Sequence, residues 1–102
     1  GGWITGDFES SAYRSPHCEV AYKRHLAGDK WPAHYQKEAT EVNFLIKGKM
    51  KLLIQYKSPR LFDAGDIFVI EPGEITEPIF LDDCELVVVK YPSIPGDKVV
   101  VE

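Results

Sequence analysis

The sequence of 102 residues has few cysteines, no long apolar run and no cluster of basic residues. Its two cysteines, Cys18 and Cys84, lack the close spacing of a sulfur-based zinc site, so we expect two free thiols. No apolar stretch approaches the ~20 residues of a membrane span, and the first residues lack the regions of a signal peptide. We therefore expect a cytoplasmic protein that does not cross a membrane.

Positive charge is also scarce. Twelve Lys and Arg stand against sixteen Asp and Glu, which gives a net charge of −4 with the two signs interspersed. Because no basic run can follow a phosphate backbone, neither nucleic acid nor an anionic membrane is an expected partner. The length suits one domain, and 44% hydrophobic and 27% charged residues are typical of a folded protein.

Short runs rich in Val, Ile, Phe and Tyr alternate with turn formers at roughly the 8–12-residue spacing of an all-β sandwich or barrel. Residues 1–17 are expected to form an N-terminal arm, and residues 18–102 a single barrel domain. Residues 33–42 have some helix propensity, but the surrounding period of two favours strands there as well. The main predicted strands cover residues 19–26, 40–47, 49–57, 67–70, 79–81 and 85–91.

Four of these segments carry more specific predictions. Gly48 separates two predicted strands and suggests that they pair as a hairpin. Residues 67–70 are apolar on both faces, so both faces should be covered. In the first long strand, alternation is expected to place Val20 and Tyr22 on the inner face, with Lys23 and His25 on the outer face.

The main candidate functional residues, His34, Gln36 and Glu41, lie between Gly28 and Gly48. In an extended segment His34 and Gln36 point to the same face, and Glu41 can rejoin that face after a turn. An imidazole, an amide and a carboxylate can thus converge on one point.

This stretch resembles the first signature of the cupin superfamily: a glycine, five residues, His-x-His, three or four residues, a glutamate, six residues and a glycine. Gln36 stands in place of the second histidine. The frame of the second signature persists in Gly65 and Gly73, but Thr76 replaces its histidine and Phe80 its asparagine. The chain resembles small, single-domain RmlC-like cupins of unassigned function. This implies an all-β, double-stranded jelly roll, which is an antiparallel β-barrel with little helix.

The resemblance also implies a site where three histidines and a glutamate hold a divalent metal. Of these positions the chain keeps His34 and Glu41, whereas Gln36 and Thr76 offer neutral oxygens that bind transition metals weakly. One interpretation is a divalent ion (Zn, Ni, Mn or Fe) at low occupancy on His34, Gln36 and Glu41. The favoured interpretation is that these three side chains hydrogen-bond one another and water.

Two classes of function follow. In the first, the barrel is a binding module for a small polar or carbohydrate-like molecule. In the second, it is an enzyme, either a metal-dependent oxygenase or a metal-free sugar epimerase or isomerase in which His34 is the base and Glu41 orients it. The predicted pocket residues are Tyr22, Arg24, His34, Gln36, Glu41, Asn43 and Thr76.

The strand that carries Glu41 also predicts a homodimer. If Glu41 points into the barrel, Asn43 points in with it, and Val42, Phe44 and Ile46 point out. Monomers seldom leave such an apolar face exposed, so we expect a second subunit to cover it.

Overall fold

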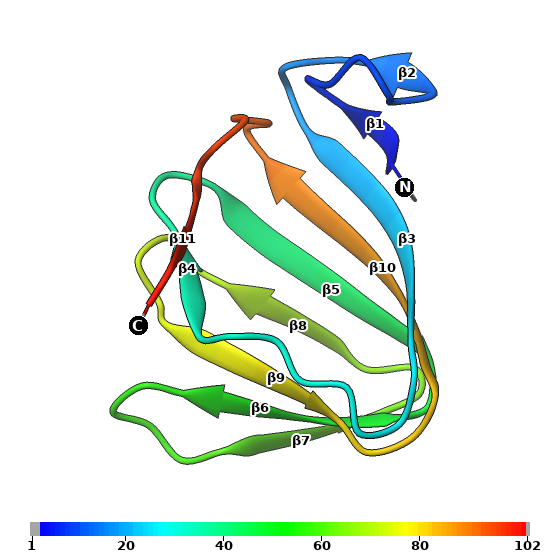
Figure 1. The fold of residues 1–102 in the computed structure, drawn as a ribbon, viewed down its shortest axis with the longest axis vertical. Coiled ribbons are helices and arrows are strands. Elements are labelled where there is room, and N and C mark those ends of the chain that lie inside the picture. The colour runs from blue at the N-terminus through cyan, green and yellow to red at the C-terminus, as the bar shows by residue number, and fades with distance from the viewer. Residues whose placement is uncertain (1–2, 102) are drawn as a thin grey trace.

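The structure is a computed structural model that describes residues 3–101, and within that range it contains strands and no helix. Figure 1 shows the strands arranged as two facing sheets. The strands are β1 (Trp3–Gly6), β2 (Tyr13–Arg14), β3 (Glu19–His25), β4 (His34–Gln36), β5 (Thr40–Lys47), β6 (Lys49–Ile54), β7 (Arg60–Asp63), β8 (Ile67–Ile70), β9 (Thr76–Phe80), β10 (Cys84–Tyr91) and β11 (Lys98–Val100). The all-β prediction is confirmed, and the strand interpretation of residues 33–42 with it. Residues 3–101 include no helix with the length and apolar character of a membrane span.

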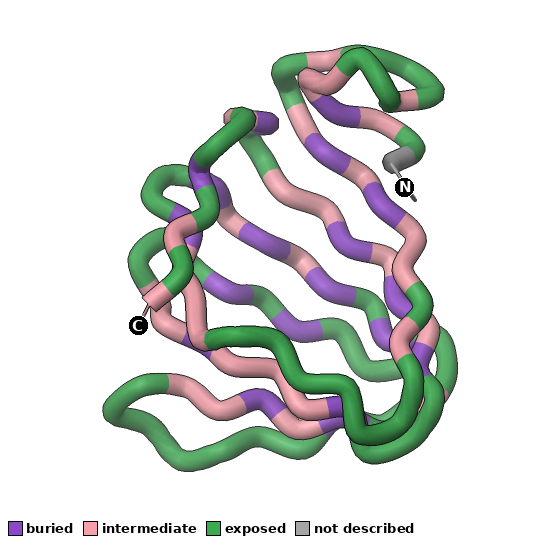
Figure 2. Tube along the Cα trace, in the orientation of Figure 1, coloured by how far each residue is buried: buried purple, intermediate pink, exposed green. Residues whose placement is uncertain are grey.

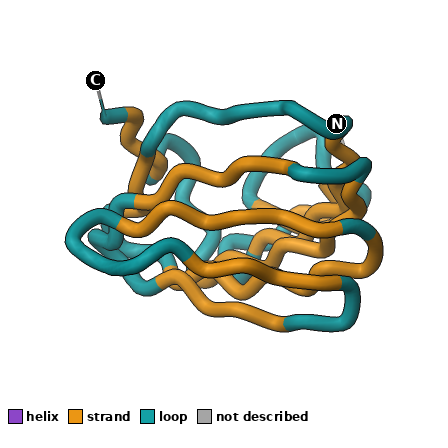
Figure 3. Tube along the Cα trace, turned by 90° about the horizontal axis from the view of Figure 1, so that it is seen from below, coloured by secondary structure: helices purple, strands orange, loops and turns teal. Residues whose placement is uncertain are grey.

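The six-stranded sheet has the order β2-β1-β3-β10-β5-β8, and the five-stranded sheet has the order β11-β4-β9-β6-β7. From β3 onward, consecutive strands lie in opposite sheets, except for β6 and β7, which pair with each other. Figure 3 shows the strands running between loops that gather at both ends of the molecule. The chain therefore forms a jelly roll in which each sheet turns one face inward.

The predicted hairpin at Gly48 is wrong. The strand before it, β5, pairs with β10 and β8, whereas the strand after it, β6, pairs with β7 and β9. Gly48 has a φ of +95°, and a Cβ atom there would lie 2.5 Å from the carbonyl oxygen of Asp83. Gly48 is needed because the chain crosses from one sheet to the other at a corner packed tightly against the β9–β10 turn.

The inner faces of both sheets form an apolar core, visible as the alternation of buried and exposed positions in Figure 2. Leu45 is fully buried, and the rings of Phe62 and Phe68 stack with centroids 4.1 Å apart. Burial of each such side chain stabilises the fold by roughly 1.5–3 kcal/mol. The core also contains the thiol of Cys84, and both cysteines are free, as predicted.

The prediction that residues 67–70 are covered on both faces is wrong within a single chain. Phe68 and Ile70 are buried, but Ile67 is 64% exposed and Val69 is 55% exposed. The physical reason is that the two sheets pack through their inner faces, so the described residues leave the outer side of β8 open to solvent.

The segment predicted as an N-terminal arm contributes to the six-stranded sheet. Strand β1 pairs antiparallel with β3, and β2 pairs parallel with β1. The amide of Asp7 also donates a hydrogen bond of 2.8 Å to the hydroxyl oxygen of Ser93. These contacts tie residues 3–14 to the domain, so this part of the predicted arm extends the sheet.

Candidate functional site

A cavity of about 90 Å³ lies between the two sheets. Pockets that enclose drug-sized ligands measure roughly 300–1,000 Å³, so this one suits a compact molecule. Apolar side chains such as Ile70, Leu86 and Val88 form much of its wall. Its polar and charged lining residues are Lys23, His25, His34, Glu41, Asn43, Thr76, Lys90 and Lys98.

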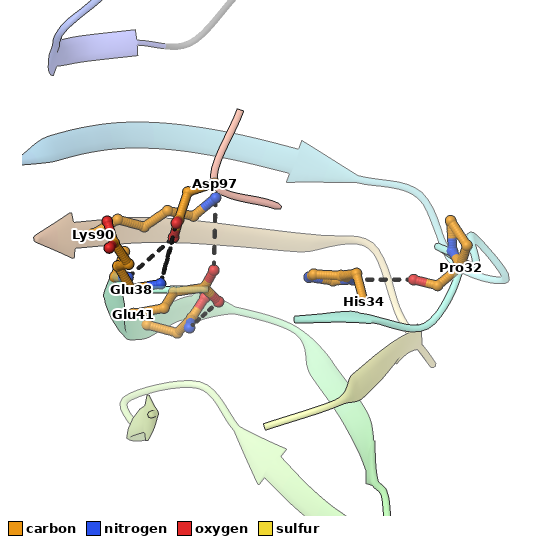
Figure 4. A network of polar contacts seen from close by, with 8 residues as sticks. Pro32, His34, Glu38, Glu41, Lys90 and Asp97 are labelled. Carbon is orange, nitrogen blue, oxygen red and sulfur yellow. Dashed lines mark hydrogen bonds and ion pairs between the residues drawn. The ribbon is translucent and has the colours of Figure 1, made fainter. Parts of the chain in front are cut away.

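His34 enters the cavity from β4 with a defined proton arrangement. Its Nδ1 lies 3.0 Å from the carbonyl oxygen of Pro32, as Figure 4 shows. Because a carbonyl only accepts hydrogen bonds, Nδ1 carries the proton and Nε2 keeps a lone pair in the neutral ring. Burial lowers the pKa of His34, against the opposing effect of the Pro32 carbonyl. The imidazole is therefore neutral near pH 7 and can accept a hydrogen bond.

Glu41 is held by two neighbours, and His34 is not one of them. The side-chain amide of Asn43 donates a 2.8 Å hydrogen bond to Glu41 Oε2, and the ammonium nitrogen of Lys90 lies 3.8 Å from Oε1 (Figure 4). Glu41 is 8% exposed, so this pairing offsets the cost of burying its charge. Among the described residues, His34, Gln36 and Glu41 form no direct hydrogen bond with one another, so the direct contacts predicted among them are not found, including one through which Glu41 would orient His34.

Gln36 is buried but does not line the cavity. Its Nε2 has no hydrogen-bond partner among the described residues. Thr76, in contrast, lies opposite His34 in the β4–β9 pairing and lines the cavity. Of the predicted pocket residues, the structure brings together His34, Glu41, Asn43 and Thr76, and it places Gln36 outside this group.

Tyr22 and Arg24 do not line the cavity either, because the predicted faces of β3 are reversed. Tyr22 lies opposite Val87 on β10, and its hydroxyl group donates a hydrogen bond to the carboxylate of Glu85 on the outer side of the sheet. Lys23 and His25 line the cavity instead. A shift of one position turns every side chain of a strand to the opposite face. One error in the phase of β3 therefore misplaced both Tyr22 and Arg24.

His25 belongs to an aromatic group beside the cavity. Its ring stacks on Phe80 at 4.1 Å, and its Nδ1 accepts a hydrogen bond of 3.2 Å from the indole nitrogen of Trp31. Burial lowers the pKa of His25, which keeps the accepting nitrogen unprotonated near pH 7. The ammonium group of Lys98 lies 5.5 Å from the centroid of the Trp31 ring, within the range of a cation–π contact.

The sequence reasoning missed Lys90 and Lys98 as cavity residues. Lys90 shares an inner face with the buried Leu86 and Val88 of β10, and this alternation was a usable signal. For Lys98 no such signal exists, because β11 has three residues and follows a segment rich in proline and glycine.

The residues in the cavity do not fit the metal site that the cupin resemblance implies. The described residues contain no group of three His, Cys, Asp or Glu side chains that could hold an ion. His34 is the one imidazole at a signature position, Glu41 is paired with Lys90, and Gln36 lies outside the cavity lining. Three lysine side chains in the same cavity add repulsion toward a divalent cation.

No family model matches the sequence, and no curated protein sequence matches it. Solved structures do match. An uncharacterised conserved protein with a double-stranded β-helix domain from Klebsiella pneumoniae has a TM-score of 0.76 and 18% identity, covering 86% of this chain and 77% of that one. An RmlC-like cupin family protein with a double-stranded β-helix fold from Methanocaldococcus jannaschii has a TM-score of 0.68 and 22% identity, covering 76% and 72%.

The DMSP lyase DddQ from Ruegeria pomeroyi is also similar, with a TM-score of 0.81 and 21% identity over 97% of this chain. This chain spans about half, 49%, of the length of that lyase. At identities this low, the likeness concerns the course of the backbone, and the predicted double-stranded architecture is confirmed.

Proposed function

We propose that this chain, which has the cupin fold, binds a compact polar molecule in the cavity between its sheets and does so without a resident metal. The carrying observation is the convergence of His34, Asn43 and Thr76 on one cavity whose wall also contains apolar side chains such as Ile70, Leu86 and Val88. A few polar groups that fix orientation within an apolar enclosure are typical of small-molecule sites.

Each polar residue has a distinct role in this proposal. Nε2 of His34 accepts a hydrogen bond from a ligand hydroxyl or amide group, and the hydroxyl of Thr76 donates or accepts. Asn43 and Lys90 hold Glu41 in place. The small cavity favours a short polyol or hydroxy compound, or one edge of a sugar, over an enclosed hexose.

Fluorescence of Trp31 offers a direct test, because this residue lines the cavity. In a Trp3→Phe variant Trp31 is the remaining tryptophan. Titration with short polyols, hydroxy amides and hydroxy acids should give a saturable change for at least one compound. His34→Ala should weaken that binding roughly tenfold, the effect of losing about one hydrogen bond of 1.4 kcal/mol. The exposed His17 supplies the control, His17→Ala, which should bind as the parent does. No saturable change, or equal affinity in both variants, would reject the proposal.

A second candidate function is metal-free proton transfer, and the state of His34 favours it. A neutral imidazole with Nδ1–H bonded to the Pro32 carbonyl is prepared to accept a proton at Nε2. The chemistry would be exchange of a proton beside a carbonyl group, as in an epimerase or isomerase. Deuterium incorporation into short hydroxy ketones in D₂O, followed by NMR, tests this. Activity should vanish in His34→Ala and persist in His17→Ala; equal exchange in both variants would contradict it.

A further inference from the structure

The cavity opens to solvent beside Trp31, on the loop between β3 and β4, and Lys98 on β11. Among the described lining residues these two are the exposed ones, and Trp31 is 45% exposed. The polar residues Asn43 and Thr76 of the same lining are buried, at 5% and 3% exposure. A ligand that reaches these buried groups and extends out of the cavity therefore lies beside the indole of Trp31.

The loop that carries Trp31 is fastened to its surroundings before and after this residue. The amide of Gly28 donates a hydrogen bond of 2.8 Å to the carbonyl oxygen of Phe80 on β9. After Trp31, the carbonyl oxygen of Ala33 accepts a hydrogen bond of 2.8 Å from the amide of Val101. Because the backbone is held on both sides, little freedom is lost when a ligand binds against this side chain.

The indole of Trp31 is itself oriented by His25. Its nitrogen donates the 3.2 Å hydrogen bond to Nδ1 of His25, and the two rings are nearly perpendicular, at 84°. The indole has a single hydrogen-bond donor, and this contact uses it, so the group offers a ligand its apolar ring surface. The ammonium group of Lys98, 5.5 Å from the ring centroid, belongs to an exposed side chain, and a ligand can replace this weak contact.

The cavity thus combines two kinds of recognition. His34, Asn43 and Thr76 provide neutral groups that hydrogen-bond to hydroxyl groups, and Trp31 provides a flat apolar surface. A saturated ring that carries hydroxyl groups matches both, because hydroxyl groups project from its edge and C–H groups cover its faces. An open-chain polyol has the hydroxyl groups and lacks the flat face.

We propose that the ligand is a cyclic polyol, either a pyranose sugar or a cyclitol, that inserts one edge among His34, Asn43 and Thr76 and stacks a ring face on Trp31. This inference rests on the proposed function and specifies its ligand class. Trp31 is the residue that selects rings over open chains, and His25 is a positioning residue that holds the indole. The cavity of about 90 Å³ suits this arrangement because only one edge of the ring enters it.

The test compares rings with open chains that carry similar hydroxyl groups. Calorimetric titration pairs myo-inositol with sorbitol, and methyl β-D-galactopyranoside with galactitol. At least one ring should bind about tenfold more tightly than its open-chain counterpart, because an aromatic stacking contact contributes about this factor to affinity. Tighter binding by the galactoside identifies a sugar ligand, and tighter binding by myo-inositol identifies a cyclitol.

Variants of Trp31 identify the stacking surface, with folding checked by circular dichroism. Trp31→Leu keeps an apolar side chain without a flat ring, so it should weaken ring binding about tenfold and leave open-chain binding unchanged. Trp31→Phe restores an aromatic face and should retain most of the affinity. The matched control is Tyr13→Ala, at a 71% exposed aromatic position outside the cavity lining, which should bind as the parent does.

His25→Phe tests the positioning role. This substitution keeps a ring against Phe80 but removes the acceptor of the indole hydrogen bond. It should weaken ring binding and leave open-chain binding unchanged. In the Trp3→Phe background it should also increase the quenching of Trp31 fluorescence by acrylamide, because the indole is held less firmly. Unchanged quenching and unchanged ring affinity would reject the positioning role of His25.

The outcomes separate this inference from the proposed function. Open-chain polyols, hydroxy amides or hydroxy acids that bind through His34 at least as tightly as both rings would overturn the ring inference and leave the proposed function standing. Ring binding that Trp31→Leu and Tyr13→Ala weaken equally would also overturn it. Absence of binding by the rings and by all of these open-chain compounds would reject both proposals.

Discussion

Phe44 on β5 lies directly opposite Ile67 on β8, and both side chains face the outer side of the six-stranded sheet. Val42 and Val69 form the next outward pair. The registers of β3 and β10 extend both pairs into rows that cross four strands. We name this surface the outer patch; its residues are Val20, Tyr22, Val42, Phe44, Ile67, Val69, Val87 and Val89.

We expect a second copy of the chain to cover the outer patch. The apolar character of β8 on both faces is typical of a strand enclosed on both sides, and one chain encloses only the inner side. Burial of large side chains that are 39–64% exposed, such as Phe44 and Ile67, yields a substantial part of the roughly 1.5–3 kcal/mol for full burial. The patch is contiguous and lies on a regular sheet, which suits a two-fold contact of the surface with itself.

Sedimentation at micromolar concentration tests the dimer. The unaltered protein should sediment as a dimer, and Phe44→Glu should convert it to a monomer because a carboxylate would be buried at the contact. Leu61→Glu, at a 65% exposed position on β7, is the matched control and should remain dimeric. A monomeric parent protein would contradict the dimer. Dissociation by both variants would show that the outer patch alone does not form the contact.

Leu45→Ala should destabilise the fold by about 2–5 kcal/mol, because Leu45 is fully buried in the apolar core and its loss leaves a void. Urea denaturation followed by circular dichroism measures this free energy. Leu61→Ala should change it by no more than about 0.5 kcal/mol, since that side chain is mostly exposed. Similar losses for both variants would contradict the described core.

Asp97 fastens the C-terminal segment to the turn between β4 and β5. Its carboxylate accepts hydrogen bonds from the amides of Glu38, at 3.1 Å, and Ala39, at 3.0 Å, as the contacts in Figure 4 illustrate. Asp97→Ala leaves these amides without that partner and should cost about 1–3 kcal/mol of unfolding free energy. Asp97→Asn should cost less, because one acceptor oxygen remains. The exposed Asp82→Ala is the control, and an equal loss there would argue against this role.

Stability should fall as the pH drops below about 6.5, the ordinary pKa of histidine. Burial lowers the pKa of both His25 and His34 in the folded chain, so between the folded and unfolded values the unfolded chain binds more protons. Protonation of His25 also removes the acceptor for the Trp31 indole. The raised pKa of Glu19 acts in the opposite direction, so the histidines must be isolated by substitution.

The measurement is urea denaturation of the parent and of His25→Gln plus His34→Gln at several pH values from about 8 to about 5.5. The double variant should lose less stability over this interval than the parent does. Equal losses would show that other groups control the acid sensitivity.

The sequence predicted the architecture well because alternation and the glycine frame are local signals. Gly28 and Gly48 bound the segment that contains His34 and Glu41, and both of these side chains line the cavity. The outward placement of Phe44 followed from the same alternation once Glu41 was placed inside.

The predictions that failed depended on which strands pair with one another and on which sheet each strand belongs to. The phase of β3 depends on its pairing with β10, so Tyr22 and Lys23 exchanged faces. Gly48 looked like a hairpin turn because sequence does not show that β5 and β6 belong to different sheets. The cavity lysines come from three separate strands, and no local pattern in the sequence brings Lys23, Lys90 and Lys98 together.

The central claim is that the cavity between the sheets binds its ligand without a metal. Two-dimensional ¹H–¹⁵N NMR of the unaltered protein, titrated in excess EDTA with the tightest-binding of the polyols, hydroxy amides and hydroxy acids, tests it most directly. The account predicts saturable shifts at the amides of His34, Asn43, Thr76 and Val88, with no response in the outer patch. Shifts that appear only after zinc or nickel is added, or that are confined to the outer surface, would contradict it.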